Sequence, residues 1–147
     1  MPEKKTIERA KKDKAQGKAP TTQAGEFVRE EMEHIRQGKH GARSPQQAIA
    51  IGLSKARRAG VDLKPPRKGT TSESTRKRAE RDLEKGRSGA PTKTSPKRSR
   101  ARQAVLKRES RSAASKSALS KHAKQAAARR RVRGKVTSSG SSKHRSR

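Results

Sequence analysis

The stretch TTQAGEFVREEMEHIRQGKHGARSPQQAIAIGLSKARRAG, residues 21–60, decides the fold of this chain. Its first part predicts an amphipathic helix over residues 23–37, because apolar side chains recur there every three or four residues. Thr21 or Thr22 is expected to cap the helix, and Gly38 to end it. The apolar side chains of this helix are Ala24, Phe27, Val28, Met32 and Ile35.

The second part of the stretch predicts another helix, which begins with a strong start signal. Ser44 is expected to be the N-cap, Pro45 to take the first helical position, and Gln47 to complete a capping box. Gly60 should end the helix in a Schellman motif, with Val61 making its apolar contact. The face of this helix carries Ala48, Ile49, Gly52, Leu53 and Ala56.

Two amphipathic helices joined by about six residues predict an all-α fold built on a small antiparallel hairpin. Gly52 and the alanines should let the helices approach closely. So few large apolar side chains give a hairpin only marginal stability. We therefore expect a homodimer through the hairpin, or a bound ligand, to add stability.

The rest of the chain predicts isolated charged helices, with long disordered basic linkers and a disordered basic tail. A polar helix over 2–16 should end at Gly17 and be frayed unless something docks on it. Pro65-Pro66 marks an extended linker. Further helices are expected over 73–86, 99–109 and about 117–132, with a disordered tail from Gly134. The predicted divisions are a polar helix (1–20), the hairpin (21–63), a linker with a charged helix (64–98), a basic Ala-rich helical region (99–133) and a basic tail (134–147).

The composition excludes several classes of protein. The chain has 147 residues, a formal net charge of +29, one aromatic residue and no cysteine. Membrane spans, disulfide frameworks and Cys-based zinc sites are therefore excluded. The chain has too few apolar side chains to enclose a water-excluding pocket. We therefore expect neither an enzyme nor a cofactor.

The positive charge is concentrated in the second half. Residues 1–66 carry a net +7 and residues 67–147 a net +22, with +18 from residue 92 onward. Clusters this dense bind nucleic-acid phosphates through counterion release. The predicted phosphate contacts are Lys97, Arg98, Arg100, Arg102, Lys121, Lys124, Arg129, Arg130, Arg131, Arg133 and Lys135 in the basic half, with Lys39, Arg43, Lys55, Arg57 and Arg58 in the hairpin.

These observations lead to a non-enzymatic, histone-like protein that binds DNA largely without sequence specificity. DNA is preferred over RNA because RNA readers stack bases on exposed aromatics, and Phe27 lies on the apolar face. The N-terminal residues contain no apolar run of the kind found in secretory signals. A cytoplasmic location at the bacterial nucleoid is therefore expected.

Two other functions stay open. One is an RNA- or ribosome-associated factor. The other is an adaptor in plasmid maintenance, supported by acidic residues on the first hairpin helix that would repel DNA: Glu26, Glu30, Glu31 and Glu33. No membrane partner is expected, because the basic helices are apolar mainly through alanine.

Metal binding is not expected from the spacing of the histidines. His34 and His40 are conceivable ligands together with Glu30 or Glu31, but the sequence has neither an H-x3-H pair nor an HExxH motif.

Three motifs resemble a bacterial family of short basic proteins classed as a domain of unknown function. They are QAGEFVREE (23–31), GKHGARS (38–44) and QAIAIGLSKARRAG (47–60), and IERAKKD (7–13) also fits. The resemblance covers residues 1–63 best. Some members are loosely labelled DNA-binding or plasmid stabilisation proteins, so the resemblance agrees with nucleic-acid binding but implies no activity or site residues.

Overall fold

The computed structural model describes residues 2–89 and 93–140, and the side chains of this part up to Gly134. Every regular element in this part is helical, as the apolar spacing predicted. The elements are α1 (Lys4–Ala15), α2 (Pro20–Arg36), α3 (Pro45–Arg58), α4 (Glu73–Ser88), α5 (Pro96–Arg108), the 3₁₀ helix η1 (Arg111–Ala114) and α6 (Lys116–Gly140). No helix within the described residues is both long and apolar enough to cross a membrane.

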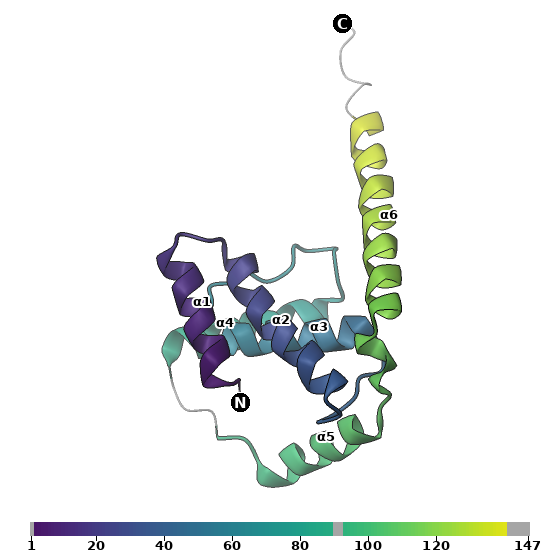
Figure 1. The fold of residues 1–147 in the computed structure, drawn as a ribbon. Coiled ribbons are helices and arrows are strands. Elements are labelled where there is room, and N and C mark those ends of the chain that lie inside the picture. Colours follow the sequence, from purple (N-terminus) through teal and green to yellow (C-terminus); the bar gives the residue numbers. More distant parts are fainter. Residues whose placement is uncertain (1, 90–92, 141–147) are drawn as a thin grey trace, which may run out of the picture.

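The helices α2 and α3 form the centre of the fold and run in opposite senses across their contact (Figure 1). Near one end, Ile35 packs in a cluster with Ala48; near the other, Phe27 packs in a cluster with Ala56. Gly52 lies at the crossing, where a β-carbon would stand only 2.7 Å from the Cα of Val28. The expected close approach of the two helices therefore depends on a missing side chain.

Two apolar clusters fill the space around this pair. The η1 cluster lies at the C-terminal end of α2, and the α1 cluster lies at its N-terminal end. The η1 cluster consists of Met32, Ile35, Ala42, Ala48, Ala113 and Ala114, and the α1 cluster of Ala10, Ala24, Phe27, Ala56 and Val61.

Both clusters include residues from outside the predicted hairpin. α1 docks on α2 and buries Ala10, although we expected a frayed helix unless something docked on it. Ala113 and Ala114 of η1 cover the opposite end, and the Nε atom of Arg36 donates to the carbonyl of Ala114 at 3.0 Å. The chain itself therefore covers both ends of the apolar face of the hairpin, and a homodimer stays a prediction.

The charged helix α4 is not isolated, which corrects the sequence prediction. It packs on α3 and buries Ala79 and Leu83. Gly86 does not end the helix, since α4 continues to Ser88 and Gly89 takes the left-handed conformation with φ of 61°. A β-carbon on Gly86 would stand 1.9 Å from the carbonyl oxygen of Arg57, so this glycine permits the contact with α3.

The caps of α3 largely confirm the predicted start and stop signals. The Ser44 hydroxyl accepts from the amide of Gln47 at 3.2 Å, with Pro45 in the first position. The Gln47 side chain reaches the amide of Arg43 at 2.7 Å, one residue before the expected capping-box position. At the other end, Gly60 and Val61 donate to the carbonyls of Arg57 and Ala56, the pair of bonds that defines a Schellman motif.

The helix α2 starts earlier than predicted. Ala19 stands at its N-cap and Pro20 takes the first helical position, so neither Thr21 nor Thr22 is the cap. Pro20 suits this position because its fixed φ is helical and its missing N–H would have no partner in the first turn.

The two most basic helices lie outside this packed body (Figure 1). α5 contacts no other helix of the described part, and α6 extends away from the body as a single rod. α6 continues to Gly140, past Gly134, where we expected disorder to begin. The expected disorder of residues 141–147 lies outside the described residues.

Candidate nucleic-acid interface

Four predicted contacts lie on α5, where the side chains of Lys97, Arg98, Arg100 and Arg102 are exposed. α5 buries no residue, and even Val105 is 57% exposed. The helix is attached to the body at its C-terminal end, where Gly41 donates to the carbonyl of Leu106 at 2.8 Å. α5 therefore presents its cations to solvent from nearly all sides.

The predicted contacts on α6 have the same character. The side chains of this set from Lys121 to Arg133 are exposed. Only the first turns of the helix touch the body, where Leu119 packs against the η1 cluster. The described side chains are Lys121, Lys124, Arg129, Arg130, Arg131 and Arg133. Lys135 lies in the helix, but its side chain lies outside the described part.

The cations at the end of α3 serve the interior of the body. Arg57 is only 7% exposed, and its Nε atom donates to the carbonyl of Leu63 at 3.0 Å. Burial lowers the pKa of Arg57, and the charge of Asp82 acts in the opposite direction. Lys55 donates to a carboxylate oxygen of Glu31, a residue with no exposed surface. These two cations are held inside, so we leave them out of the proposed interface.

The remaining predicted cations of the hairpin are also engaged, but they are more exposed. Arg58 lies 3.7 Å from Asp82, Lys39 lies 3.3 Å from Glu3, and Arg43 lies 4.0 Å from Glu109. Surface ion pairs of this kind contribute little stability and exchange easily for phosphate. We keep these three as secondary contacts.

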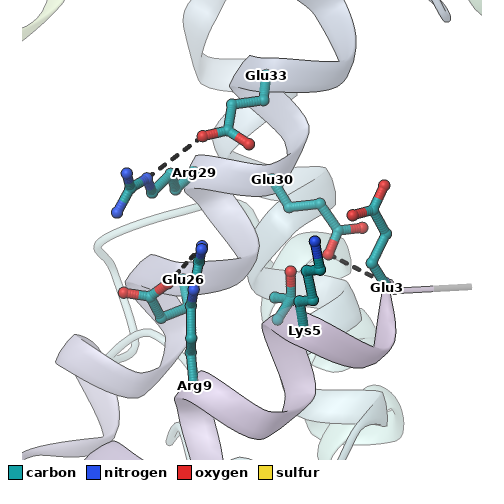
Figure 2. Close-up of a pocket in the computed structure, with 8 residues that line it drawn as sticks. Glu3, Lys5, Arg9, Glu26, Arg29, Glu30 and Glu33 are labelled. Carbon is teal, nitrogen blue, oxygen red and sulfur yellow. Dashed lines mark hydrogen bonds and ion pairs between the residues drawn. The ribbon is translucent and has the colours of Figure 1, made fainter.

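The acidic residues of α2, which supported an adaptor function, are mostly neutralised within the body. Glu26, Glu30 and Glu33 line a polar hollow between α1 and α2, in which acidic and basic side chains alternate (Figure 2). Arg9 lies 3.8 Å from Glu26, Arg29 lies 3.4 Å from Glu33, and Glu30 accepts from the amide of Glu3 at 3.1 Å. Cations therefore lie beside Glu26 and Glu33, whereas Glu30 is bound by a neutral amide, and the adaptor function stays a prediction.

Phe27 is 1% exposed, within the α1 cluster. This confirms that the one aromatic side chain of the protein belongs to the core and is not available for base stacking. Recognition in the body by stacked bases is thereby disfavoured.

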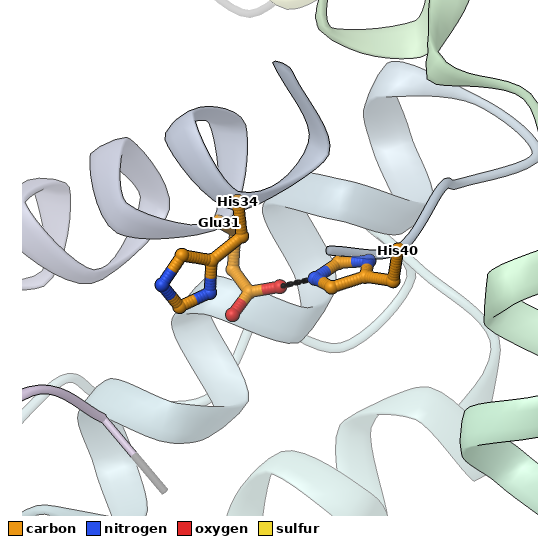
Figure 3. A group of neighbouring side chains, drawn as sticks. All are labelled: Glu31, His34 and His40. Carbon is orange, nitrogen blue, oxygen red and sulfur yellow. Dashed lines mark ion pairs between the residues drawn. The ribbon is translucent and has the colours of Figure 1, made fainter. Parts of the chain in front are cut away.

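Three residues that the sequence offered only as conceivable metal ligands come together in the structure. Glu31, His34 and His40 lie so close that one ligand atom from each falls within 4.8 Å of the others (Figure 3). We did not expect metal binding, because the sequence has neither an H-x3-H pair nor an HExxH motif, and His40 reaches Glu31 only through the loop after α2. The pattern Glu31-x-x-His34, which places two ligands on one helical face, was the available clue.

Comparisons of the chain with protein-family models, curated proteins and solved structures find no match. The assignment of a function therefore depends on the geometry and charge of this chain.

Proposed function

We propose that this protein is a non-enzymatic, histone-like DNA-binding protein whose helical body carries two basic arms, α5 and α6 from Lys121 onward. The observation that supports the proposal most strongly is the separation of charge from packing. α5 contains six Lys and Arg residues, α6 from Lys121 contains seven, and neither contains an acidic residue. Within the body, by contrast, most carboxylates lie beside a cation of the body.

The length of the α6 arm suits a duplex. Twenty helical residues, 121–140, extend about 30 Å at 1.5 Å per residue. One turn of B-DNA measures about 34–36 Å. The six cations with described side chains, from Lys121 to Arg133, are distributed around the helix, so contacts to phosphates of both strands are available without a fixed orientation. Such contacts hold the protein on DNA and do not read sequence.

The absence of acidic side chains in the arms gives DNA a second role. Neighbouring like charges at i,i+4 destabilise an isolated helix, and neither arm has a packed apolar face to compensate. Phosphates remove this repulsion. Binding should therefore stabilise the arm helices as well as position the protein on the duplex.

The decisive experiment is a truncation that removes the α6 arm beyond Ala123 and keeps the body. The cut has to follow Ala123, because η1 and Leu119 belong to the η1 cluster. A chain of residues 1–123 loses nine Lys and Arg residues. If the full chain engages about 8–10 phosphates, log K should fall with log salt with a slope of about −7 to −9, at about −0.9 per contact.

We expect the truncated chain to have a clearly shallower slope and weaker affinity for every duplex sequence. Its body should keep the unfolding midpoint of the full chain, which serves as the folding control. An unchanged salt slope would overturn the proposal and place binding in the body. Competition by an RNA duplex of equal length separates the DNA-binding function from the RNA-associated alternative, in which RNA displaces DNA efficiently.

A further inference from the structure

Glu31, His34 and His40 form a compact donor cluster where α2 meets the loop of residues 37–44. Glu31 and His34 lie one turn apart on α2, and a Schellman motif at Gly38 turns the chain back toward the helix. This turn brings the Nε2 atom of His40 to 3.2 Å from the Oε2 atom of Glu31 (Figure 3). The cluster belongs to the body and is separate from the basic arms.

Each histidine is oriented by an acceptor on its outer nitrogen. The Nε2 atom of His34 lies 2.9 Å from the Oε1 atom of Glu3, and the Nδ1 atom of His40 lies 2.9 Å from the carbonyl oxygen of Gly41. Carboxylates and carbonyls only accept, so these outer nitrogens carry hydrogens. In a neutral imidazole the inner nitrogen then presents a lone pair. Metal-binding histidines are held in this way by carboxylates and backbone carbonyls.

The inner side of the cluster therefore brings acceptors together. In Figure 3, the second ring nitrogen of His34 and the Nε2 atom of His40 both face the carboxylate of Glu31. Glu31 has no exposed surface, and its Oε2 atom accepts no hydrogen bond from the described residues. Two acceptors at 3.2 Å repel each other unless a proton or a metal cation lies between them.

The surrounding charges leave room for a divalent cation. Lys55 donates to the other oxygen of Glu31, and its positive charge disfavours binding of a metal cation nearby. The carboxylates of Glu3 and Glu30 lie on the far side of His34, 2.9 and 4.0 Å from its Nε2 atom, and offset that opposition. Lys39, beside Glu3, is half exposed and screened by solvent.

We propose that Glu31, His34 and His40 bind Zn²⁺ or a chemically similar transition-metal ion. Two imidazole nitrogens and one carboxylate oxygen are the donors that zinc accepts, and hard cations such as Ca²⁺ and Mg²⁺ require more oxygens. Tetrahedral bonds of about 2.0–2.1 Å place ligand atoms about 3.3 Å apart, close to the 3.2 Å between His40 and Glu31. The ligand atoms of all three residues lie within 4.8 Å of one another, and a small movement of the His40 loop would bring them to bonding positions.

Such an ion would join the end of α2 to the loop that carries the basic arm. His40 is followed directly by Gly41, whose amide binds the carbonyl of Leu106 at the end of α5. A β-carbon on Gly41 would stand 2.0 Å from the carbonyl oxygen of Glu109, so this junction is tightly packed. The metal would act as a structural clip at this junction, with water as its fourth ligand.

The first test measures metal binding by the full chain without nucleic acid, so its outcome is independent of DNA binding. Zn²⁺ is titrated in competition with a chromophoric chelator, and Co²⁺ reports the geometry through its visible absorption. We expect one ion per chain, a tetrahedral Co²⁺ spectrum, and a midpoint of thermal unfolding raised by about 5–10 °C at a hundredfold excess over Kd. A net charge of +29 disfavours adventitious binding elsewhere on the surface.

The second test compares His40→Ala and His34→Ala with His122→Ala, a histidine of α6 outside the cluster. We expect at least a tenfold loss of zinc affinity and loss of the tetrahedral spectrum in the first two variants, and no change in the third. Equal affinities in all three would overturn the proposal. Absence of stoichiometric binding by the unmodified chain would also overturn it, and would assign a proton to the space between His40 and Glu31. This measurement on the unmodified chain does not depend on the folding of any variant.

Discussion

Gly52 of α3 lies against Val28 of α2 so closely that a β-carbon on Gly52 would stand 2.7 Å from the Val28 Cα and 2.9 Å from its nitrogen. Both contacts are backbone atoms, which do not move without displacing a helix. This approach brings α2 and α3 into contact between the two apolar clusters. The packing of the body therefore depends on it.

Gly52→Ala should therefore destabilise the body. Overpacking costs about 1–3 kcal/mol, which exceeds the gain of about 1 kcal/mol from a better helix former. Gly25→Ala is the matched control, because Gly25 lies within α2 with nothing within 4 Å of its β-carbon position. Urea denaturation should show a lower midpoint for the first variant and a raised midpoint for the second. Stabilisation by both would mean that the helices do not meet at Gly52.

Ser44→Ala should remove the side-chain cap of α3. The loss of the hydrogen bond from the Gln47 amide should lower the free energy of unfolding by about 0.5–2 kcal/mol. Ser95→Ala is the control, since Ser95 stands at the N-cap of α5 without a side-chain cap bond. Thermal unfolding should separate the two variants. Equal midpoints would show that the cap of α3 contributes nothing.

Lys55→Met should leave the buried carboxylate of Glu31 without its lysine partner. Breaking a buried pair in this way costs about 3 kcal/mol. Replacing both partners, Lys55→Met with Glu31→Leu, should recover most of this loss, because no buried charge remains uncompensated. Lys12→Met on the surface of α1 is the control. The unfolding measurements are made in EDTA, so that no metal ion bound at Glu31 contributes to stability. A double variant less stable than the Lys55→Met variant would contradict the pairing of Lys55 with Glu31.

The location of the arm cations should matter more than the net charge. Replacing Lys97, Arg98, Arg100 and Arg102 by Gln should reduce the magnitude of the salt slope by up to about 3–4, at about 0.9 per lost phosphate contact. The control replaces four exposed lysines of α1 by Gln, which removes the same charge from the body. These lysines are Lys4, Lys11, Lys12 and Lys14.

Fluorescence titration at several salt concentrations measures both slopes. The α1 variant should retain nearly the full slope, and the α5 variant should weaken all duplex sequences equally. Equal slopes for the two variants would mean that overall charge, and not the arm, governs binding.

A short DNA duplex should increase the helical content of the full chain. The arms lack acidic residues, so phosphates remove repulsion that favours fraying. Far-ultraviolet circular dichroism of the protein, with the DNA contribution subtracted, measures the gain. The chain of residues 1–123 should show a smaller gain. Equal gains would indicate that the body changes on binding and the arm does not.

Local signals in the sequence predicted where several helices begin and end. The Ser44-Pro45 start and the Gly60 stop of α3 were correct, because caps involve residues within a few positions of one another. The prediction failed at Gly86. This residue is a glycine like Gly60, but it permits a close contact with the carbonyl oxygen of Arg57 and does not end its helix. A glycine by itself does not distinguish a helix end from a close approach.

The sequence also identified the basic half and its charge, since net charge requires no knowledge of contacts. It did not distinguish cations that serve the interior from cations that face solvent. Arg57 and Arg58 are neighbours, yet Arg57 is 7% exposed and Arg58 is exposed. Which of them lies inside depends on where the segment after α3 folds back, because the carbonyl of Leu63 accepts from Arg57.

The sequence by itself thus determined the helical class, the caps of α3, the burial of Phe27 and the concentration of charge beyond residue 92. Each follows from composition or from residues within one or two turns of a helix. The tertiary structure alone decided that η1 completes the core, that Lys55 neutralises Glu31 and that His40 meets Glu31. Those contacts join segments 9 to 78 residues apart, and the small alanine side chains of η1 leave little pattern in the sequence.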